Sequence, residues 1–169
     1  MRRIEDYALI GDMQAAALVG CDGAIDWLCW PRFDSGACFA SLLGTRDHGH
    51  WTIAPASRVV STTRRYRRAT LVLETEFTTE GGVVRLIDCM PPRRDAPTVV
   101  RIVEGVEGDV DMRMDLLPRF DYGSIVPWVE RTDGMVCAIG GPDAVSLWSP
   151  VVPDRVGPIT SAAFRIGAG

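Results

Sequence analysis

Short stretches in which apolar and polar residues alternate, each closed by a turn, run through most of this chain. The clearest of them runs from Asp109 to Leu116, and every second residue in it is apolar. A period of two is that of a β-strand with one buried face. The longest helical pattern is the stretch 35–43. The sequence therefore predicts an all-β fold, an antiparallel β-sandwich, with one short helix near residues 35–43.

Four turn sequences are placed to join neighbouring strands into hairpins. Glycine tolerates the positive φ that a tight hairpin turn requires. The turns are Asp22-Gly23, Gly81-Gly82, Glu107-Gly108 and Asp133-Gly134. The predicted hairpins pair 16–19 with 25–29, 71–77 with 83–90, 99–106 with 109–116, and 128–131 with 135–139. Further strands are expected at 49–53, 144–149 and 161–166.

One acid stands among the apolar residues of a predicted strand. Asp88 shares a strand face with Val84, Leu86 and Met90. We expect it to be a buried or rim acid, and hydrogen bonding to a turn is its expected role.

The composition fits one globular domain and argues against several classes of partner. The chain has 169 residues, 47% of them hydrophobic and 24% charged, which is enough to bury a core. Its net charge of −4 gives no footprint for nucleic acid. No apolar run is long enough to cross a bilayer. The arginine cluster at 64–68 is interpreted as a solvated strand edge, where basic residues discourage pairing with another sheet.

The cysteines and the first residues of the chain are typical of a cytoplasmic protein. Five cysteines form no CxxC pair and have no zinc spacing, so we interpret them as buried free thiols. A Cys21–Cys29 bridge is the alternative, and a reducing compartment disfavours it. Glu5 and Asp6 occupy the place of the apolar core of a signal peptide. We therefore expect a cytoplasmic location.

The stretch 22–39 contains a predicted strand that ends abruptly, a polar loop and the start of the predicted helix. Pro31 ends the strand because it lacks a backbone donor. The loop 30–35 then presents four unlike side chains, Arg-Phe-Asp-Ser. Asp34 or Ser35 is suited to cap the helix that follows. Loops held between rigid elements often carry function.

Two long segments carry a family resemblance. The first is IEDYALIGDMQAAALVGCDGAIDWLCWPRFDSGACFASLLG, and the second is TLVLETEFTTEGGVVRLIDCMP at 70–91. They resemble the amino-terminal domain of bacterial glycoside hydrolase family 15 proteins, the trehalase- and glucoamylase-like group. The resemblance covers essentially the whole chain. The sequence departs from the family at Cys21, where a basic or polar residue is expected, and at Gly36, where a proline is usual.

The resemblance implies that residues 1–169 are a super-sandwich domain that precedes a catalytic (α/α)6 barrel. In this family two glutamates of the barrel run an inverting hydrolysis, which needs one acid and one base. The barrel is absent from this sequence, so we assign no catalytic residue and expect the chain alone to be inactive. The final Gly-Ala-Gly looks like a turn, and we expect the domain to be truncated before its last strand or strands.

The resemblance also implies the partners of the domain. These are the barrel of the same parent chain and, through it, an α-glucoside such as trehalose or a maltooligosaccharide, with no cofactor. Trp30, Arg32 and Asp34 suit a sugar, because an indole packs on a pyranose face while the charged groups bond to hydroxyls. We therefore expect the loop 30–35 to reach the mouth of the barrel's pocket. The alternative is that Arg32 and Asp34 pair with each other and hold the turn.

Aromatic residues near this loop suit an interface with the barrel. They are Trp27, Phe33, Phe39 and Trp51. A free-standing carbohydrate-binding module or a protein-interaction module is the alternative function. A carbohydrate-binding module would need a row of exposed aromatic residues on one sheet face, whereas these tryptophans cluster near one loop. His48 and His50 are interpreted as part of a solvated turn, so no metal site is expected.

Overall fold

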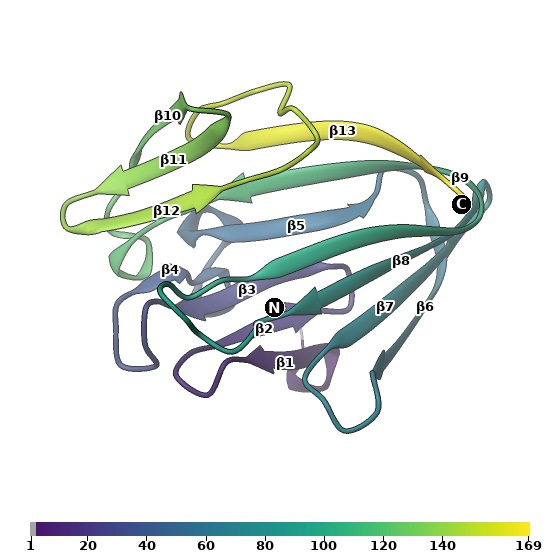
Figure 1. Ribbon diagram of the computed structural model, residues 1–169, viewed down its shortest axis with the longest axis horizontal. Helices are drawn as coiled ribbons and strands as arrows, with labels where there is room; N and C mark the ends of the chain where they lie inside the picture. Colours follow the sequence, from purple (N-terminus) through teal and green to yellow (C-terminus); the bar gives the residue numbers. More distant parts are fainter. Residues whose placement is uncertain (1–2) are drawn as a thin grey trace.

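The computed structural model describes residues 3–169, which form a curled antiparallel β-structure (Figure 1). Its strands are β1 (Tyr7–Gly11), β2 (Ala16–Gly20), β3 (Ala24–Cys29), β4 (Ala37–Phe39), β5 (His50–Pro55), β6 (Val59–Tyr66), β7 (Leu73–Thr79), β8 (Gly82–Cys89), β9 (Val100–Leu117), β10 (Trp128–Thr132), β11 (Met135–Gly140), β12 (Asp143–Leu147) and β13 (Thr160–Gly167). The 3₁₀ helices are η1 (Ile4–Asp6), η2 (Ser41–Leu43), η3 (Arg46–His48) and η4 (Asp121–Gly123). The predicted all-β antiparallel sandwich is confirmed. None of the helices between residues 3 and 169 combines the length and apolarity that crossing a bilayer requires.

Most strands belong to one large sheet that folds over on itself. Its order is β1-β2-β3-β5-β9-β8-β7-β6, with β4 added to β3 and β13 added to β9. A separate small sheet, β10-β11-β12, lies at the upper left in Figure 1, beside the end of the large sheet near β4 and β5. The curl brings the two halves of the large sheet face to face, and the core fills the space between them.

Strand β9 connects the two halves, and it corrects one prediction. The hairpin predicted across Glu107-Gly108 is wrong, because 100–117 is one continuous strand. Its first half pairs with β8, and its second half lies between β5 and β13. Gly108 has a φ of +63°, and a Cβ there would lie 2.3 Å from the carbonyl oxygen of Gly81. Gly108 therefore permits a local irregularity in β9, at the point where β9 stops pairing with β8. The chain does not reverse there.

The other predicted hairpins are present. Gly23, with φ +79°, turns β2 into β3, and Asp133 and Gly134, with φ +51° and +79°, turn β10 into β11. Both turns use the left-handed backbone region expected of these residue types.

The helix predicted near residues 35–43 is wrong. Residues 37–39 form β4, which pairs with β3 through Leu28–Phe39 and Cys29–Ala37, and only the 3₁₀ turn η2 follows. A stretch this short is a marginal helix in isolation, and pairing with β3 buries all three residues of β4. Leu43, the last residue of η2, is exposed. Tertiary pairing therefore decides the local structure here.

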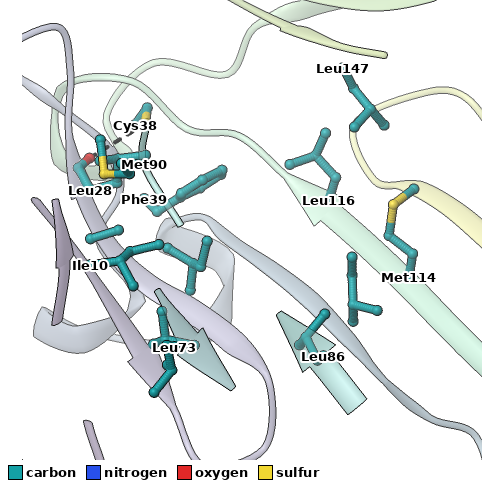
Figure 2. Close-up of a cluster of buried hydrophobic side chains, with 14 of the residues drawn as sticks. Ile10, Leu28, Cys38, Phe39, Leu73, Leu86, Met90, Met114, Leu116 and Leu147 are labelled. Carbon is teal, nitrogen blue, oxygen red and sulfur yellow. Dashed lines mark hydrogen bonds between the residues drawn. The ribbon is translucent and has the colours of Figure 1, made fainter. Parts of the chain in front are cut away.

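The core collects apolar side chains from both halves of the large sheet and from the small sheet. Figure 2 shows Leu28 and Phe39 from one half, Leu73 and Leu86 from the other, and Leu147 from β12. The alternating residues of β9 that were predicted to point inward are buried as expected: Val110, Met112, Met114 and Leu116. The predicted period-two pattern therefore identifies the inner face of this half of β9.

The two ends of the large sheet, β1 and β6, meet along a seam. The Tyr66 hydroxyl donates to the carbonyl oxygen of Leu9 and accepts from its amide, both at 2.9 Å. Arg64 donates to the carbonyl oxygen of Val19 at 3.2 Å. The arginine-rich strand β6 is the edge strand that the sequence predicts, and some of its polar side chains cover the neighbouring edge of β1.

Candidate functional site

The loop 30–35 leaves β3 at one end of the sandwich and is fastened to its neighbours by the backbone. The Phe33 amide donates to the carbonyl oxygen of Gln14 at 2.9 Å, which ties the loop to the β1–β2 connection. Within the loop, the Ser35 amide donates to the carbonyl oxygen of Arg32, and the Ser35 hydroxyl accepts from the Arg32 amide. The Trp30–Pro31 peptide bond is cis. The loop is therefore a compact turn with its side chains at the rim.

Arg32 and Asp34 form a two-pronged ion pair across this turn. Arg32 Nε donates to Asp34 Oδ1 at 2.9 Å, and Nη2 donates to Oδ2 at 3.3 Å. The hydrogen bond from Arg32 holds the pKa of Asp34 below its usual value. Both side chains are mostly exposed, at 67% and 72%. The Arg32–Asp34 ion pair, predicted as the alternative to a sugar-binding role, is therefore present. Both charged groups still face solvent, where a ligand can reach them.

A buried ion pair supports the loops next to this turn. Asp12 Oδ2 accepts from Arg93 Nε at 3.0 Å and from Nη2 at 2.8 Å, and Oδ1 accepts from the amides of Gln14 and Ala15. The Asp12 side chain is 0% exposed. Burial opposes its ionisation, but the hydrogen bonds from the two amides and from Arg93 outweigh burial, so the pKa of Asp12 lies below its usual value.

We expect this pair to make the domain sensitive to acid. A carboxyl group whose pKa is lowered by folding contributes stability above its unfolded pKa, about 3.9 for aspartate, and loses it as the pH falls through the folded value. Asp12→Asn should therefore lower the free energy of unfolding at pH 7 and flatten its fall below about pH 4. Urea unfolding between pH 2 and pH 7, a range from about two units below that pKa to about three units above it, measures both effects. Asp133→Asn, in an exposed turn, is the control, and an equal acid slope in Asp12→Asn and wild type would contradict the expectation.

The aromatic residues expected at an interface lie in different environments. Phe33 is 60% exposed, whereas Phe39 is 2% exposed and belongs to the core. Phe39 therefore does not reach a surface in this structure, because β4 pairs with β3 and turns it inward. Trp27 is partly buried, and its ring lies 5.9 Å from that of Tyr122. Trp51 is partly buried and packs against the core.

Trp51 belongs to a buried polar network that the sequence did not reveal. Arg101 pairs with Asp88 at 2.8 Å, both side chains are 0% exposed, and the guanidinium lies 5.0 Å from the Trp51 ring centre. Arg101 also donates to the carbonyl oxygens of Trp51 and Gly23, each at 2.7 Å. Asp88 is buried as predicted, but its partner is an arginine. Since Arg101 links β9 to β5, β8 and the β2–β3 turn, the network joins both halves of the sandwich.

A cleft of about 240 Å³ opens beside the loop 30–35. Residues from four separate segments line it: Trp30, Pro31, Pro97, Phe120, Pro142 and Asp143. The three connections that follow β3, β8 and β9 meet the β11–β12 turn here. Trp30, predicted as a sugar-binding residue, lies in the cleft wall, whereas Arg32 and Asp34 do not line it. The structure thus places the three predicted residues on one loop but on different surfaces of it.

The histidines and cysteines of the described residues have ordinary environments. His50 is buried, and its Nδ1 lies 2.9 Å from the carbonyl oxygen of Arg46, while His48 Nδ1 contacts Thr45. Burial lowers the pKa of His50. Within residues 3–169, no three metal-ligating side chains come together. All five cysteines are free thiols, so the Cys21–Cys29 alternative is wrong. The prediction that they are buried holds only for Cys29 and Cys38, and the other three are partly buried.

Two tryptophans for which the sequence predicted no role are exposed, one in the small sheet and one directly after its last strand. Trp128 and Trp148 are 72% and 74% exposed. Trp128 pairs with Ile139, which is also exposed, and Trp148 follows the buried Leu147, so alternation places both indoles on the outer face. The sequence did not indicate that these two indoles are exposed. Period-two alternation separates the two faces of a strand, but it does not tell which face of an outer sheet is covered.

Comparison with known proteins gives one family and several relatives. A family model described as "Trehalase-like, N-terminal" matches residues 1–158. The trehalase of Thermoplasma volcanium is 36% identical over 76% of this chain and 22% of its own length. The trehalase of Mycolicibacterium smegmatis is 33% identical over 70% of this chain and 20% of its own length. Trehalase 1 of Sulfolobus acidocaldarius is 29% identical over 98% of this chain and 29% of its own length. No solved structure matches the chain significantly.

Proposed function

The chain belongs to the family of trehalase-like N-terminal domains, and from this membership we propose that it is the non-catalytic part of a longer glycoside hydrolase. The proposed substrate of the longer protein is trehalose or a related α-glucoside, because the relatives named above are trehalases. The observation that carries the proposal is the match over residues 1–158, in a chain that spans only 20% to 29% of these relatives.

The state of the carboxyl groups supports a non-catalytic role. Glycoside hydrolysis needs two facing carboxyl groups, one of which is protonated because its pKa is raised. The carboxyl groups of residues 3–169 with shifted pKa values, Asp12, Asp34 and Glu74, are all shifted downward, and each forms an ion pair with arginine. An ionised carboxylate held by arginine is a poor proton donor at neutral pH.

We further propose that the catalytic part is the (α/α)6 barrel of a glycoside hydrolase family 15 protein, and that it docks at the end of the sandwich that carries loop 30–35. The exposed Phe33 and the solvent-facing Arg32–Asp34 pair support this orientation. We also propose that the domain continues after Gly169. Among the described strands β13 pairs only with β9. Asp154 and Arg155 bond to the start of its other edge, at Ser161 and Ala163, and the rest of that edge is open to a further strand.

The proposed location of the protein is the cytoplasm. All five cysteines are free, which suits a reducing compartment. No nucleic-acid or membrane partner is proposed, because the net charge of −4 gives no electrostatic attraction to anionic surfaces.

A double variant tests whether loop 30–35 contributes to substrate binding. In the longer protein, Arg32→Ala with Asp34→Ala should lower kcat/KM for trehalose about tenfold, because hydrogen bonds from charged groups to sugar hydroxyls are lost. The melting temperature should change little, since the ion pair is exposed. Steady-state kinetics and thermal unfolding of the same preparations measure both quantities.

The control removes another exposed ion pair of the same kind. Arg165 of β13 and Asp109 in the middle of β9 pair at 3.2 Å, with 64% and 58% of their side chains exposed. Arg165→Ala with Asp109→Ala should leave kcat/KM unchanged. If the loop variant keeps its kcat/KM and only melts at a lower temperature, Arg32 and Asp34 hold the turn and do nothing else.

A carbohydrate-binding or protein-interaction module is the second candidate, and the exposed Trp128 and Trp148 favour it. Mixing the chain with the separately expressed remainder of the longer protein distinguishes the two candidates. A stable complex on gel filtration supports a domain that packs on its catalytic partner, and two independent species support a free-standing module.

A further inference from the structure

The small sheet β10-β11-β12 has one covered face and one exposed face. The covered face packs on the core through Val136 and Leu147. Alternation places every other residue of the three strands on the opposite, outer face. Single exposed apolar residues are ordinary, but a group of them on one face marks an interaction site. The exposed apolar residues of the outer face are Trp128, Met135, Ile139, Ala144 and Trp148.

The two indoles lie at opposite corners of the outer face. Trp128 begins β10 and pairs with Ile139, which pairs with Ala144 of β12. Trp148 follows four positions after Ala144, at the other edge of the sheet. With strands about 4.8 Å apart and a rise of about 3.3 Å per residue, the backbones of Trp128 and Trp148 are about 16 Å apart.

A row of polar groups crosses the outer face between the two indoles. Glu130 of β10 pairs with Cys137, which pairs with Ser146 of β12. The Glu130 carboxylate accepts from Trp128 Nε1 at 3.3 Å and from the Thr132 hydroxyl at 3.4 Å, so the indole leans along β10. Each carboxylate oxygen accepts more than one hydrogen bond. Glu130 and the exposed Ser146 therefore still have bonding capacity for a ligand.

We propose that the outer face of the small sheet binds a linear α-glucan, in addition to the site where the longer protein carries out hydrolysis. The inference rests on the proposed function, which supplies the identity of the sugar. Two linked pyranose rings, as in trehalose or maltose, are too short to reach from Trp128 to Trp148. A longer maltooligosaccharide packs the C–H faces of its rings on both indoles, and its hydroxyls bond to Glu130 and Ser146 between them.

A protein partner, either a second copy of this chain or another domain, fits the outer face less well. In protein interfaces the aromatic residues that contribute most to binding cluster near the centre, and charged residues are depleted there. Here the indoles lie at the corners, and the row between them contains Glu130. The strands have five or six residues each, so the sheet measures about 10 Å by 16 Å. A stable interface buries about 800 Å² on each partner.

Titration of the 169-residue chain tests the inference directly. The indole N–H signals of its five tryptophans are followed by two-dimensional ¹H–¹⁵N NMR, with assignments from Trp128→Phe and Trp148→Phe. Maltoheptaose should move both of these signals along one saturable curve, while the three partly buried indoles should not move. Maltose and trehalose should bind at least about tenfold more weakly, because each contacts one indole at a time. A polyethylene glycol of similar length, which has no pyranose ring, should cause no saturable shift.

Three variants complete the test. Trp128→Ala and Trp148→Ala should each weaken maltoheptaose binding about tenfold or more, because the ligand then keeps a single stacking contact. Leu43→Ala removes an apolar side chain that is 64% exposed on η2, and it should bind as wild type. Isothermal titration calorimetry measures the affinities, and the amide spectrum of each variant shows that it is folded.

Three results with sugars would overturn the inference. They are the absence of a saturable shift of both signals with maltoheptaose, equal affinity for maltoheptaose and maltose, and wild-type affinity in both tryptophan-to-alanine variants. Shifts of both signals on dilution of the sugar-free chain would instead assign the face to a second copy. Release of bound maltoheptaose by the separately expressed remainder of the longer protein would assign it to a docked domain, and either outcome also overturns the inference.

The sugar titration uses no catalytic domain, so its failure leaves the proposed hydrolase role standing. Failure of that role is seen separately, as a longer protein that hydrolyses no α-glucoside.

Discussion

Replacing Arg101 with methionine is expected to lower the free energy of unfolding by about 3–5 kcal/mol. Asp88 then keeps a negative charge where its side chain is 0% exposed. The carbonyl oxygens of Trp51 and Gly23 also lose their donor, and buried acceptors left without a donor add to the cost. Urea unfolding followed by tryptophan fluorescence measures the change, because Trp51 lies against the arginine.

Two companion variants separate the buried charge from the loss of an arginine as such. Arg113→Met removes an arginine that is 67% exposed, and its effect should stay below about 1 kcal/mol. Asp88→Leu with Arg101→Met removes both charges and should recover part of the stability that the single variant loses. A loss below about 1 kcal/mol for Arg101→Met would contradict the buried pair.

Replacing Phe39 with alanine is expected to lower the free energy of unfolding by about 3–5 kcal/mol. Phe39 is 2% exposed and lies in the core between the halves of the sheet (Figure 2). Removing its ring leaves a cavity that the paired strands β3 and β4 cannot close. Chemical denaturation of the isolated chain gives the value.

Phe33→Ala is the matched control, because Phe33 is 60% exposed on the adjoining loop. We expect a change within about 0.5 kcal/mol for the isolated chain. Equal effects at the two positions would contradict the distinction between a core and a rim phenylalanine. A large effect of Phe33→Ala only in the longer protein would support the proposed docking face.

Local patterns predicted those parts of the fold in which local chemistry decides the structure. The turns at Gly23 and Gly134 need a positive φ, and Val110, Met112 and Met114 face the core with the expected period. The same reasoning failed at Gly108. A glycine that relieves a close contact with Gly81 has the same sequence signature as a glycine that reverses the chain.

Features that depend on contacts between distant segments could not be predicted. The stretch 35–43 has local signals for a helix, but its pairing with β3 is a tertiary effect. Asp88 was predicted to be buried, yet Arg101 could be named as its partner only when β8 and β9 were placed side by side. The cleft likewise joins Trp30 to Asp143 from segments more than a hundred residues apart, and no local pattern connects them.

The most direct test of the supporting role is the release of glucose from trehalose and from maltose, measured side by side for two purified proteins. One is the 169-residue chain, and the other is the longer protein to which we propose that it belongs. We predict that the longer protein releases glucose from at least one of the two sugars and that the chain alone releases none. Glucose released by the chain alone would contradict the account.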